Sequence, residues 1–273
     1  MTIFQFIAVK PADVRIPVLI FAGMGILLGA VLAVAARVFA VKKDARVEQI
    51  TEALPGANCG GCGFSGCAAF AEAVVRGDAP ANGCRAGGAA CAAKIGEILG
   101  TEVTAAEPMR AIVRCSGGGG NANLKYHYEG ATDCIAAERM SGGDKMCATG
   151  CIGLGTCVAA CRYDALHLVN GQAVVDADKC VGCGACTAVC PKHLIELIPA
   201  DAKYCVMCRS PEPGALTRKQ CAAGCIGCKI CEKQCPAGAI TVNGCIAAID
   251  YTKCTSCGAC AAKCPRKIIR ELK

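Results

Sequence analysis

Residues 225–236 read CIGCKICEKQCP and residues 254–265 read CTSCGACAAKCP, so one cysteine pattern occurs twice in the last fifth of the chain. Each run has the spacing C-x2-C-x2-C-x3-C and ends in proline. This spacing is typical of paired [4Fe–4S] cubes in which the fourth cysteine of each run ligates the other cube. The predicted ligand sets are Cys225, Cys228, Cys231 and Cys264 for one cube, and Cys235, Cys254, Cys257 and Cys260 for the other. Between the runs, residues 240–249 read as two short strands around an Asn-Gly turn.

The same two-run unit occurs once more, earlier in the chain. Eight cysteines recur 74 residues later: Cys147, Cys151, Cys157, Cys161, Cys180, Cys183, Cys186 and Cys190 correspond to Cys221, Cys225, Cys231, Cys235, Cys254, Cys257, Cys260 and Cys264. This agreement indicates a tandem duplication, and residues 166–175 repeat the hairpin. One ligand differs, because Leu154 stands where the later copy has Cys228.

Cys147 can replace that missing ligand in the first copy. The expected sets are then Cys147, Cys151, Cys157 and Cys190 for one cube, and Cys161, Cys180, Cys183 and Cys186 for its partner. A three-cysteine [3Fe–4S] cluster without Cys147 stays open as the alternative.

A different motif stands upstream, where residues 59–67 read CGGCGFSGC and Cys84 follows. Four thiolates can hold a [4Fe–4S] cube or a tetrahedral zinc ion. The glycines allow a tight loop that brings backbone N–H groups close to sulfur. The expected ligands are Cys59, Cys62, Cys67 and Cys84. Helices are expected within residues 44–58, after Cys67, and over residues 89–99.

Residues 16–36 contain no charged side chain and are long enough, as a helix, to cross a bilayer. Two basic residues, Lys10 and Arg15, precede the span, and four, Arg37, Lys42, Lys43 and Arg46, follow it. The excess on the C-terminal side predicts that this side is cytoplasmic. A cleaved signal peptide is the alternative, but the apolar run is long for one, and export would place the thiols in an oxidising space.

Composition narrows the function further. The chain has 27 cysteines among 273 residues, an odd number in tight bunches, which favours metal centres over disulfides. The net charge of +7 comes from scattered basic residues, and aromatic residues make up only 4% of the chain. We therefore expect no nucleic-acid partner. No nucleophile arrangement or nucleotide fingerprint is present in the sequence. We therefore expect no catalytic residues and a role in electron transfer between clusters.

The fold class expected is one transmembrane helix plus α+β, with a small helical [4Fe–4S] domain followed by two tandem ferredoxin-like domains. The expected boundaries are residues 1–43 for the anchor, 44–110 for the [4Fe–4S] domain, 111–143 for a linker, 144–200 for the first ferredoxin-like domain, 201–220 for a linker and 221–273 for the second.

Five cubes leave seven cysteines unassigned: Cys91, Cys115, Cys134, Cys205, Cys208, Cys221 and Cys245. Cys205, Cys208 and Cys221 are candidates for a sixth centre, and the others read as buried packing residues, with Cys245 inside a strand. A basic C-terminal group is a candidate docking patch, with a solvated helix end as the alternative: Lys263, Arg266, Lys267, Arg270 and Lys273.

The order of these features resembles the B subunit of the Rnf complex, the ion-translocating ferredoxin:NAD⁺ oxidoreductase of bacteria. The resemblance rests on a membrane span, then LPGANCGGCGFSGC with Cys84, then motifs that include CATGCIGLGTCVAAC, and it covers nearly the whole chain. It implies a membrane-anchored, cytoplasm-facing subunit that takes electrons from reduced ferredoxin and passes them to other Rnf subunits. The span itself has no ion ligand, so ion translocation belongs to those partners. The rival readings are an electron-transfer subunit of another membrane oxidoreductase and, more remotely, a zinc-binding scaffold.

Overall fold

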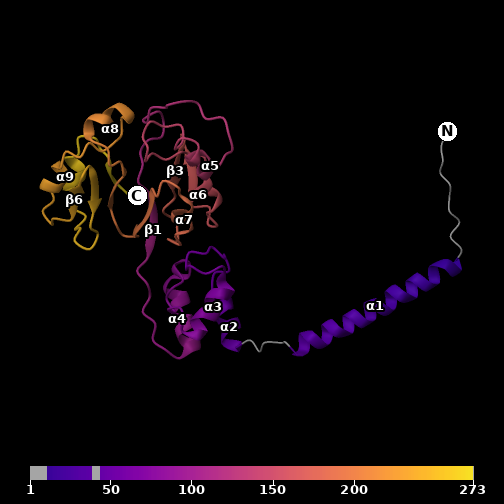
Figure 1. Cartoon of the computed structure of the whole chain (residues 1–273). Helices are drawn as coiled ribbons and strands as arrows, with labels where there is room; N and C mark the ends of the chain where they lie inside the picture. Colours follow the sequence, from indigo (N-terminus) through magenta and orange to yellow (C-terminus); the bar gives the residue numbers. More distant parts are fainter. Residues whose placement is uncertain (1–10, 39–43, 273) are drawn as a thin grey trace, which may run out of the picture. The chain divides into compact units, whose positions relative to one another are not determined.

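The computed structural model describes residues 11–38 and 44–272 of the chain, which divides into two units at residue 44. The first unit contains helix α1 (Pro11–Val38) (Figure 1). Within the described residues this is the one helix long and apolar enough to cross a membrane, over Val18–Arg37 with a mean hydropathy of 2.6. The apolar span expected from the sequence is therefore helical. Lys10, Lys42 and Lys43, used for the orientation argument, lie outside the described residues.

The second unit begins with a small helical domain. Its elements are α2 (Ala45–Ala53), α3 (Cys67–Arg76), η1 (Arg85–Gly87) and α4 (Gly88–Leu99). Ile50, Phe70 and Ile95, one from each α-helix, are at most 1% exposed and form its core. The three expected helices are confirmed, and the packed side chains hold the glycine-rich loop of residues 59–66 between α2 and α3.

The first ferredoxin-like module has two antiparallel strand pairs and three short helices. The pairs join β1 (Met109–Val113) with β4 (Ile195–Pro199) and β2 (Leu166–Val169) with β3 (Gln172–Val175); the helices are α5 (Cys134–Arg139), α6 (Thr156–Ala159) and α7 (Ala185–Val189). The core between these elements contains cysteines as well as aliphatic side chains such as Leu166 and Leu194.

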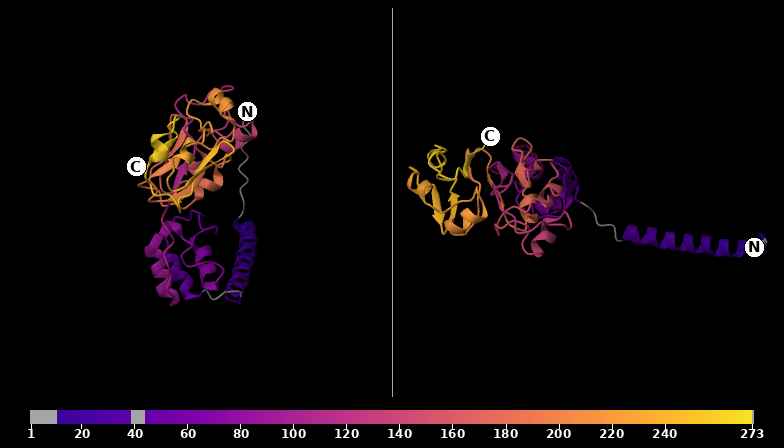
Figure 2. Two further views of the ribbon diagram at one scale, coloured as in Figure 1. Left: turned by 90° about the vertical axis from the view of Figure 1, so that its left-hand side faces the viewer. Right: turned by 90° about the horizontal axis from the view of Figure 1, so that it is seen from above.

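The second module, drawn in orange to yellow in Figure 2, repeats this plan. Its strand pairs join β5 (Tyr204–Val206) with β8 (Ile269–Glu271) and β6 (Ile240–Asn243) with β7 (Ile246–Ile249); its helices are α8 (Gly214–Gln220), α9 (Ile230–Lys233) and α10 (Ala259–Ala262). The α+β class with one apolar helix, a helical domain and two tandem modules is confirmed.

The two segments expected as linkers contain regular structure. Residues 111–143 include most of β1, which pairs with the last strand of the first module, and helix α5. Residues 201–220 include β5, which pairs with the last strand of the second module, and helix α8. Each module thus takes its outer strand from the segment that precedes it, a pairing that short-range spacing does not reveal.

The two hairpins are confirmed, with a difference at their turns. In the first, Asn170 and Gly171 both have positive φ (50° and 71°) and form the two-residue loop. In the second, Asn243 pairs with Ile246, so the loop is Gly244-Cys245. Cys245 therefore lies in the turn, and its expected place inside a strand is wrong.

The modules are joined by a buried arginine. The Arg114 guanidinium donates to the carbonyl oxygens of Val206, Cys208 and Ala247 in the second module, at 3.3, 3.3 and 2.6 Å. It also pairs with Glu196 at 3.1 Å. Arg114 is 7% exposed, and its buried charge is stable there because several acceptors surround the guanidinium.

Candidate iron–sulfur sites

The cavity beside α3 is lined by the four cysteines of the upstream motif, Cys59, Cys62, Cys67 and Cys84. The Asn58 side chain accepts a hydrogen bond from the Cys67 amide at 2.8 Å and so closes the loop. Burial raises the pKa of the Cys84 thiol, and the neighbouring sulfurs of Cys62, Cys67 and Cys59 raise it further. Four sulfurs that repel one another as thiolates suit a cationic iron centre. We refer to this set as site 1.

Site 1 lies against the first module. Cys183 also lines this cavity, and the Cys59 sulfur is the neighbouring sulfur that raises the pKa of the Cys183 thiol most, after burial. A Cβ atom on Gly61 would stand 1.9 Å from the Cys183 carbonyl oxygen, so only glycine allows this approach. The Tyr163 hydroxyl is buried close by without a hydrogen-bond partner among the described residues. Burial raises the pKa of Tyr163 to about 12, so the group is a neutral O–H donor.

In the first module, four cysteines line one cavity: Cys134, Cys151, Cys157 and Cys190. Burial raises the pKa of the Cys157 thiol to about 12, and the sulfurs of Cys151, Cys134 and Cys190 add to the rise. We refer to this set as site 2. It has three of the four cysteines that spacing groups there, with Cys134 where Cys147 was expected.

Cys134 reaches site 2 through a local capping network. Asp133 caps helix α5 by accepting from the Ala136 amide at 3.0 Å, and it accepts the Thr156 hydroxyl at 2.7 Å. The same hydroxyl accepts the Cys134 amide at 2.7 Å. Thr156 precedes Cys157, so the network holds the two cysteines together. Leu154, which replaces the usual ligand, packs in the small cluster that contains Cys134.

The second run of the first module gathers the set that spacing predicts, which we refer to as site 3: Cys161, Cys180, Cys183 and Cys186. Burial raises the pKa of the Cys186 thiol to about 12, and the neighbouring sulfurs of Cys183, Cys180 and, from site 2, Cys157 add to the rise. The Cys161 sulfur accepts the Ala165 amide at 3.4 Å, and the Cys180 sulfur accepts the Ala111 amide at 3.4 Å. Backbone donors to sulfur are the usual second-shell support of such clusters.

In the second module, one cavity is lined by the predicted set Cys225, Cys228, Cys231 and Cys264, which we refer to as site 4. Burial raises the pKa of the Cys231 thiol to about 11, with Cys225, Cys264 and Cys228 close by. The remaining predicted set is site 5: Cys235, Cys254, Cys257 and Cys260. Cys260 lies near Cys235 and Cys254, and the Cys235 sulfur accepts the Ala239 amide at 3.2 Å.

The arrangement of the thiols suits cubes better than single ions. Among the residues that the structure describes, no group of three or more His, Cys, Asp or Glu side chains is gathered closely enough for one metal ion. A cube presents each thiolate to a different corner iron, so its four sulfurs stand farther apart than the ligands of one tetrahedral zinc.

The cysteines outside the five predicted sets have different environments. Cys205 is fully buried among Ile112, Ile198 and Ala202, and it lies outside the cavity that Cys208 and Cys221 share with Cys115 and Cys147. Cys91 packs under site 1, next to Cys84. Only the missing ligand at Leu154 could have pointed to Cys134 from the sequence.

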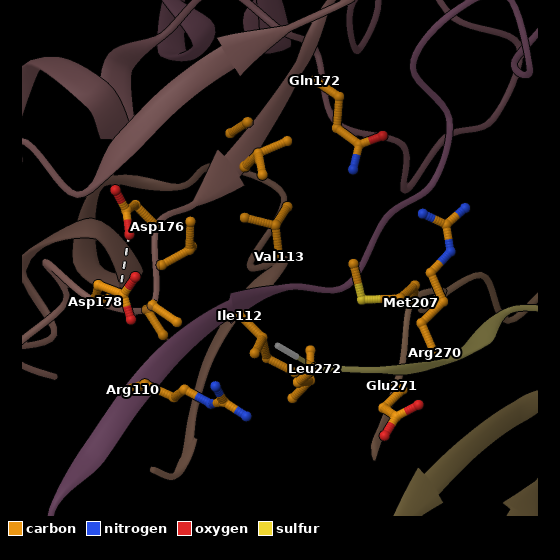
Figure 3. A pocket seen from close by; sticks show the side chains of 15 residues that line it. Arg110, Ile112, Val113, Gln172, Asp176, Asp178, Met207, Arg270, Glu271 and Leu272 are labelled. Atoms are coloured by element: carbon orange, nitrogen blue, oxygen red, sulfur yellow. Dashed lines mark hydrogen bonds between the residues drawn. The ribbon is translucent and has the colours of Figure 1, made fainter. Parts of the chain in front are cut away.

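Two other features lie away from the cysteines. A cavity of about 360 Å³ has charged and apolar walls from β1, β3 and β8 and is lined by no cysteine (Figure 3). In the basic C-terminal group, Lys263, Lys267 and Arg270 are exposed, and Lys273 lies outside the described residues. Arg266 instead donates to the carbonyl oxygens of Cys221 and Gly224, at 3.0 and 3.1 Å.

Family models match three stretches of the chain. A putative Fe-S cluster domain matches residues 54–86, and 4Fe-4S dicluster domains match residues 149–194 and 224–269. With the cysteine sets above, these matches define an iron–sulfur protein that binds [4Fe–4S] clusters and transfers electrons.

Curated relatives narrow the class to one family. The B subunit of the ion-translocating oxidoreductase complex of Methanosarcina acetivorans is 45% identical over 92% of this chain and 95% of its own length. The B subunit of the Na(+)-translocating ferredoxin:NAD(+) oxidoreductase complex of Acetobacterium woodii is 43% identical over 94% and 77%. The B subunit of the proton-translocating ferredoxin:NAD(+) oxidoreductase complex of Clostridium ljungdahlii is 41% identical over 91% of this chain and 89% of its own length. The chain therefore belongs to the family of B subunits of Rnf-type ion-translocating oxidoreductase complexes.

Proposed function

We propose that this chain takes electrons from reduced ferredoxin and relays them, one at a time, through at least five [4Fe–4S] clusters to other subunits of an Rnf-type complex. The observation that carries the proposal is the contact between successive cysteine sets. Cys183 of site 3 lines the cavity of site 1 together with Cys59, and the Cys157 sulfur of site 2 is close enough to raise the pKa of Cys186 in site 3. Contact between ligands keeps neighbouring clusters close, which fast electron hopping requires.

The ligand sets of the proposal are those of sites 1 to 5. Sites 1, 3, 4 and 5 keep the cysteines that spacing groups, and site 2 takes Cys134 in place of Cys147. The lining of the site 2 cavity and the Asp133–Thr156 network support that exchange. When bound, each cube supplies a one-electron redox centre, and the chain supplies thiolates, backbone N–H donors and burial, which set its potential.

We further propose that α1 anchors the chain as a single span, with the cluster domains on the cytoplasmic side. The length and hydropathy of α1 support the span, and Arg37 and Arg46 on its C-terminal side support the orientation. Lipid and the other Rnf subunits are then its membrane contacts. The exposed Lys263, Lys267 and Arg270 are a candidate surface for an acidic electron donor such as ferredoxin.

The test is anaerobic reduction of the full-length protein in detergent by reduced ferredoxin, followed by absorbance bleaching and EPR. We expect ferredoxin to reduce all clusters of the wild type in one fast kinetic phase. Cys62→Ala should lose the EPR signal of site 1, while the signals of the clusters in the two modules persist. Replacing Lys263, Lys267 and Arg270 with Glu should slow reduction at low salt, with Cys245→Ala as a control. A wild-type protein with full iron content that ferredoxin does not reduce contradicts the proposed donor.

A further inference from the structure

Four cysteines that none of the five sites uses line a single cavity between the two modules: Cys115, Cys147, Cys208 and Cys221. Cys115, Cys208 and Cys221 are 7%, 9% and 7% exposed, and none of the four forms a disulfide. Cys115 and Cys147 come from the first module, and Cys208 and Cys221 come from the second. Four converging thiols with no other role make up a complete ligand set for one cluster.

The cavity is built as the other cluster sites are, with backbone N–H groups directed at sulfur. The Cys115 sulfur accepts the amides of Gly117 and Cys151, at 3.3 and 3.4 Å. The Cys208 sulfur accepts the amide of Cys225 at 3.3 Å. The Ser116 hydroxyl is 6% exposed, lines the cavity and has no hydrogen-bond partner among the described residues. A buried hydroxyl without a partner is costly unless something in the cavity accepts its proton.

The four thiols follow the duplication. Cys147 and Cys221 are equivalent positions, four residues before Cys151 of site 2 and Cys225 of site 4, respectively. Cys115 and Cys208 each follow a strand, β1 or β5, that pairs with the last strand of its module. The Cys115 sulfur also accepts the amide of Cys151, and the Cys208 sulfur accepts that of Cys225. Each module thus contributes an equivalent pair of cysteines to the one cavity.

Positive side chains surround the cavity. Arg114 and Arg209 line it, and Arg266 donates to the Cys221 carbonyl oxygen at 3.0 Å. Lys145, which donates to the Cys151 carbonyl oxygen at 2.6 Å, lies near Cys115. Glu196 pairs with Arg114 and Arg209, so the net local charge of these five groups remains positive. Four thiolates and their cluster carry net negative charge, which these cations offset.

We propose that Cys115, Cys147, Cys208 and Cys221 hold a sixth [4Fe–4S] cluster, which joins the two modules. The role of this cluster in electron transfer rests on the proposed function, whereas its presence does not. The Cys151 and Cys225 amides place it directly between site 2 and site 4. The electron route then runs through site 1, site 3, site 2, the sixth cluster, site 4 and site 5, in either direction. At each hop the donor cube is oxidised by one electron and the acceptor cube is reduced by one.

The test counts iron, acid-labile sulfide and zinc in the full-length protein after anaerobic purification. Six cubes of four give about 24 iron per chain, and the double variant Cys147→Ala/Cys221→Ala is expected to hold about 20. The double variant Cys147→Ala/Cys157→Ala removes one ligand from the proposed sixth site and one from site 2, so it is expected to hold about 16 iron per chain. Cys205→Ala, which removes a buried thiol three residues from Cys208, is the matched control and should keep all iron.

A wild-type content of about 20 iron that Cys147→Ala/Cys221→Ala leaves unchanged overturns the site. One zinc per chain that disappears in this variant overturns the iron–sulfur assignment. If the double variant does not purify, Cys115→Ser provides a second test, because an oxygen ligand retains a cube but shifts its EPR signal; an unchanged spectrum refutes the site.

The role of the cluster is tested separately from its presence. In Cys147→Ala/Cys221→Ala, reduced ferredoxin should reduce the clusters of one module only. The clusters of the other module should stay oxidised over the time in which the wild type is fully reduced. Full reduction at the wild-type rate overturns the bridging role. Failure of ferredoxin to reduce the wild type at all affects the proposed donor and leaves the iron count intact.

Discussion

Gly61→Ala tests the contact between site 1 and site 3. The new Cβ atom would stand 1.9 Å from the Cys183 carbonyl oxygen and 2.8 Å from its carbonyl carbon. Carbon–oxygen contacts that short do not persist, so the two loops must move apart by about 1 Å or more. Gly61 itself has no positive φ, so the effect comes from the contact and not from backbone strain.

The expected magnitude follows from overpacking at a rigid contact. We expect the free energy of unfolding to fall by about 1–3 kcal/mol if the loops shift only enough to admit the methyl group, or the contact to open completely if they cannot. In both cases the magnetic coupling between the reduced clusters of sites 1 and 3 should weaken, because dipolar coupling falls with the cube of the distance. Electron transfer between them should slow while the iron content stays at the wild-type value.

The assay combines relaxation measurements by EPR on the reduced protein with thermal unfolding of the same samples. Gly63→Ala is the matched control, because it lies in the same loop, has φ of 86° and has no atom within 4 Å of its added Cβ. It carries backbone strain of about 1 kcal/mol without touching the contact. If Gly61→Ala retains both the coupling and the stability of the wild type, the proposed approach of the two sites is wrong.

Three further predictions concern the ligands and their surroundings. Cys134→Ala should remove the site 2 signal, and adding Leu154→Cys should restore it, because the second copy has Cys228 at that position; absence of rescue on an intact fold counts against the assignment. Tyr163→Phe should keep all iron but lower the potential of a neighbouring cluster by roughly 40 mV for a hydrogen bond worth about 1 kcal/mol. Because burial raises the pKa of Tyr163 to about 12, this difference should stay constant from pH 6 to 9 in redox titrations. Iron chelation should unfold residues 45–272 but leave α1 helical in detergent, as circular dichroism and proteolysis can show.

Much of the architecture could be predicted because its signals are local. Helices α2, α3 and α4 follow from short apolar patterns, and α1 from an uninterrupted apolar run. The two hairpins follow from Asn-Gly pairs, although Gly244-Cys245 forms the second turn. In each run, the first three cysteines are separated by two residues and must converge, and the two-run pattern takes each fourth ligand from the other run, so the spacing groups the ligands of sites 4 and 5.

What could not be predicted depends on contacts between segments far apart in sequence. Strands β1 and β5 pair with the final strands of their modules, and these pairings bring Cys115 and Cys208 to the cavity between the modules. The segments that contain them have loop-like composition, because a five-residue or three-residue strand gives little periodic signal. Cys134 reaches site 2 by a capping network of Asp133 and Thr156, which also leaves no spacing signature.

The duplication nevertheless contained a constraint on Cys147. In the second copy, Cys225, Cys228, Cys231 and Cys264 complete a cube, so Cys221 is left over. Cys147 occupies the position equivalent to Cys221, and equivalent positions in a duplicated fold lie in equivalent places. Cys147 should therefore also lie outside the adjacent cube, and the ligand missing at Leu154 should come from elsewhere. Two leftover thiols at equivalent positions, in modules that share an interface, favour a common site between the modules over two separate packing roles.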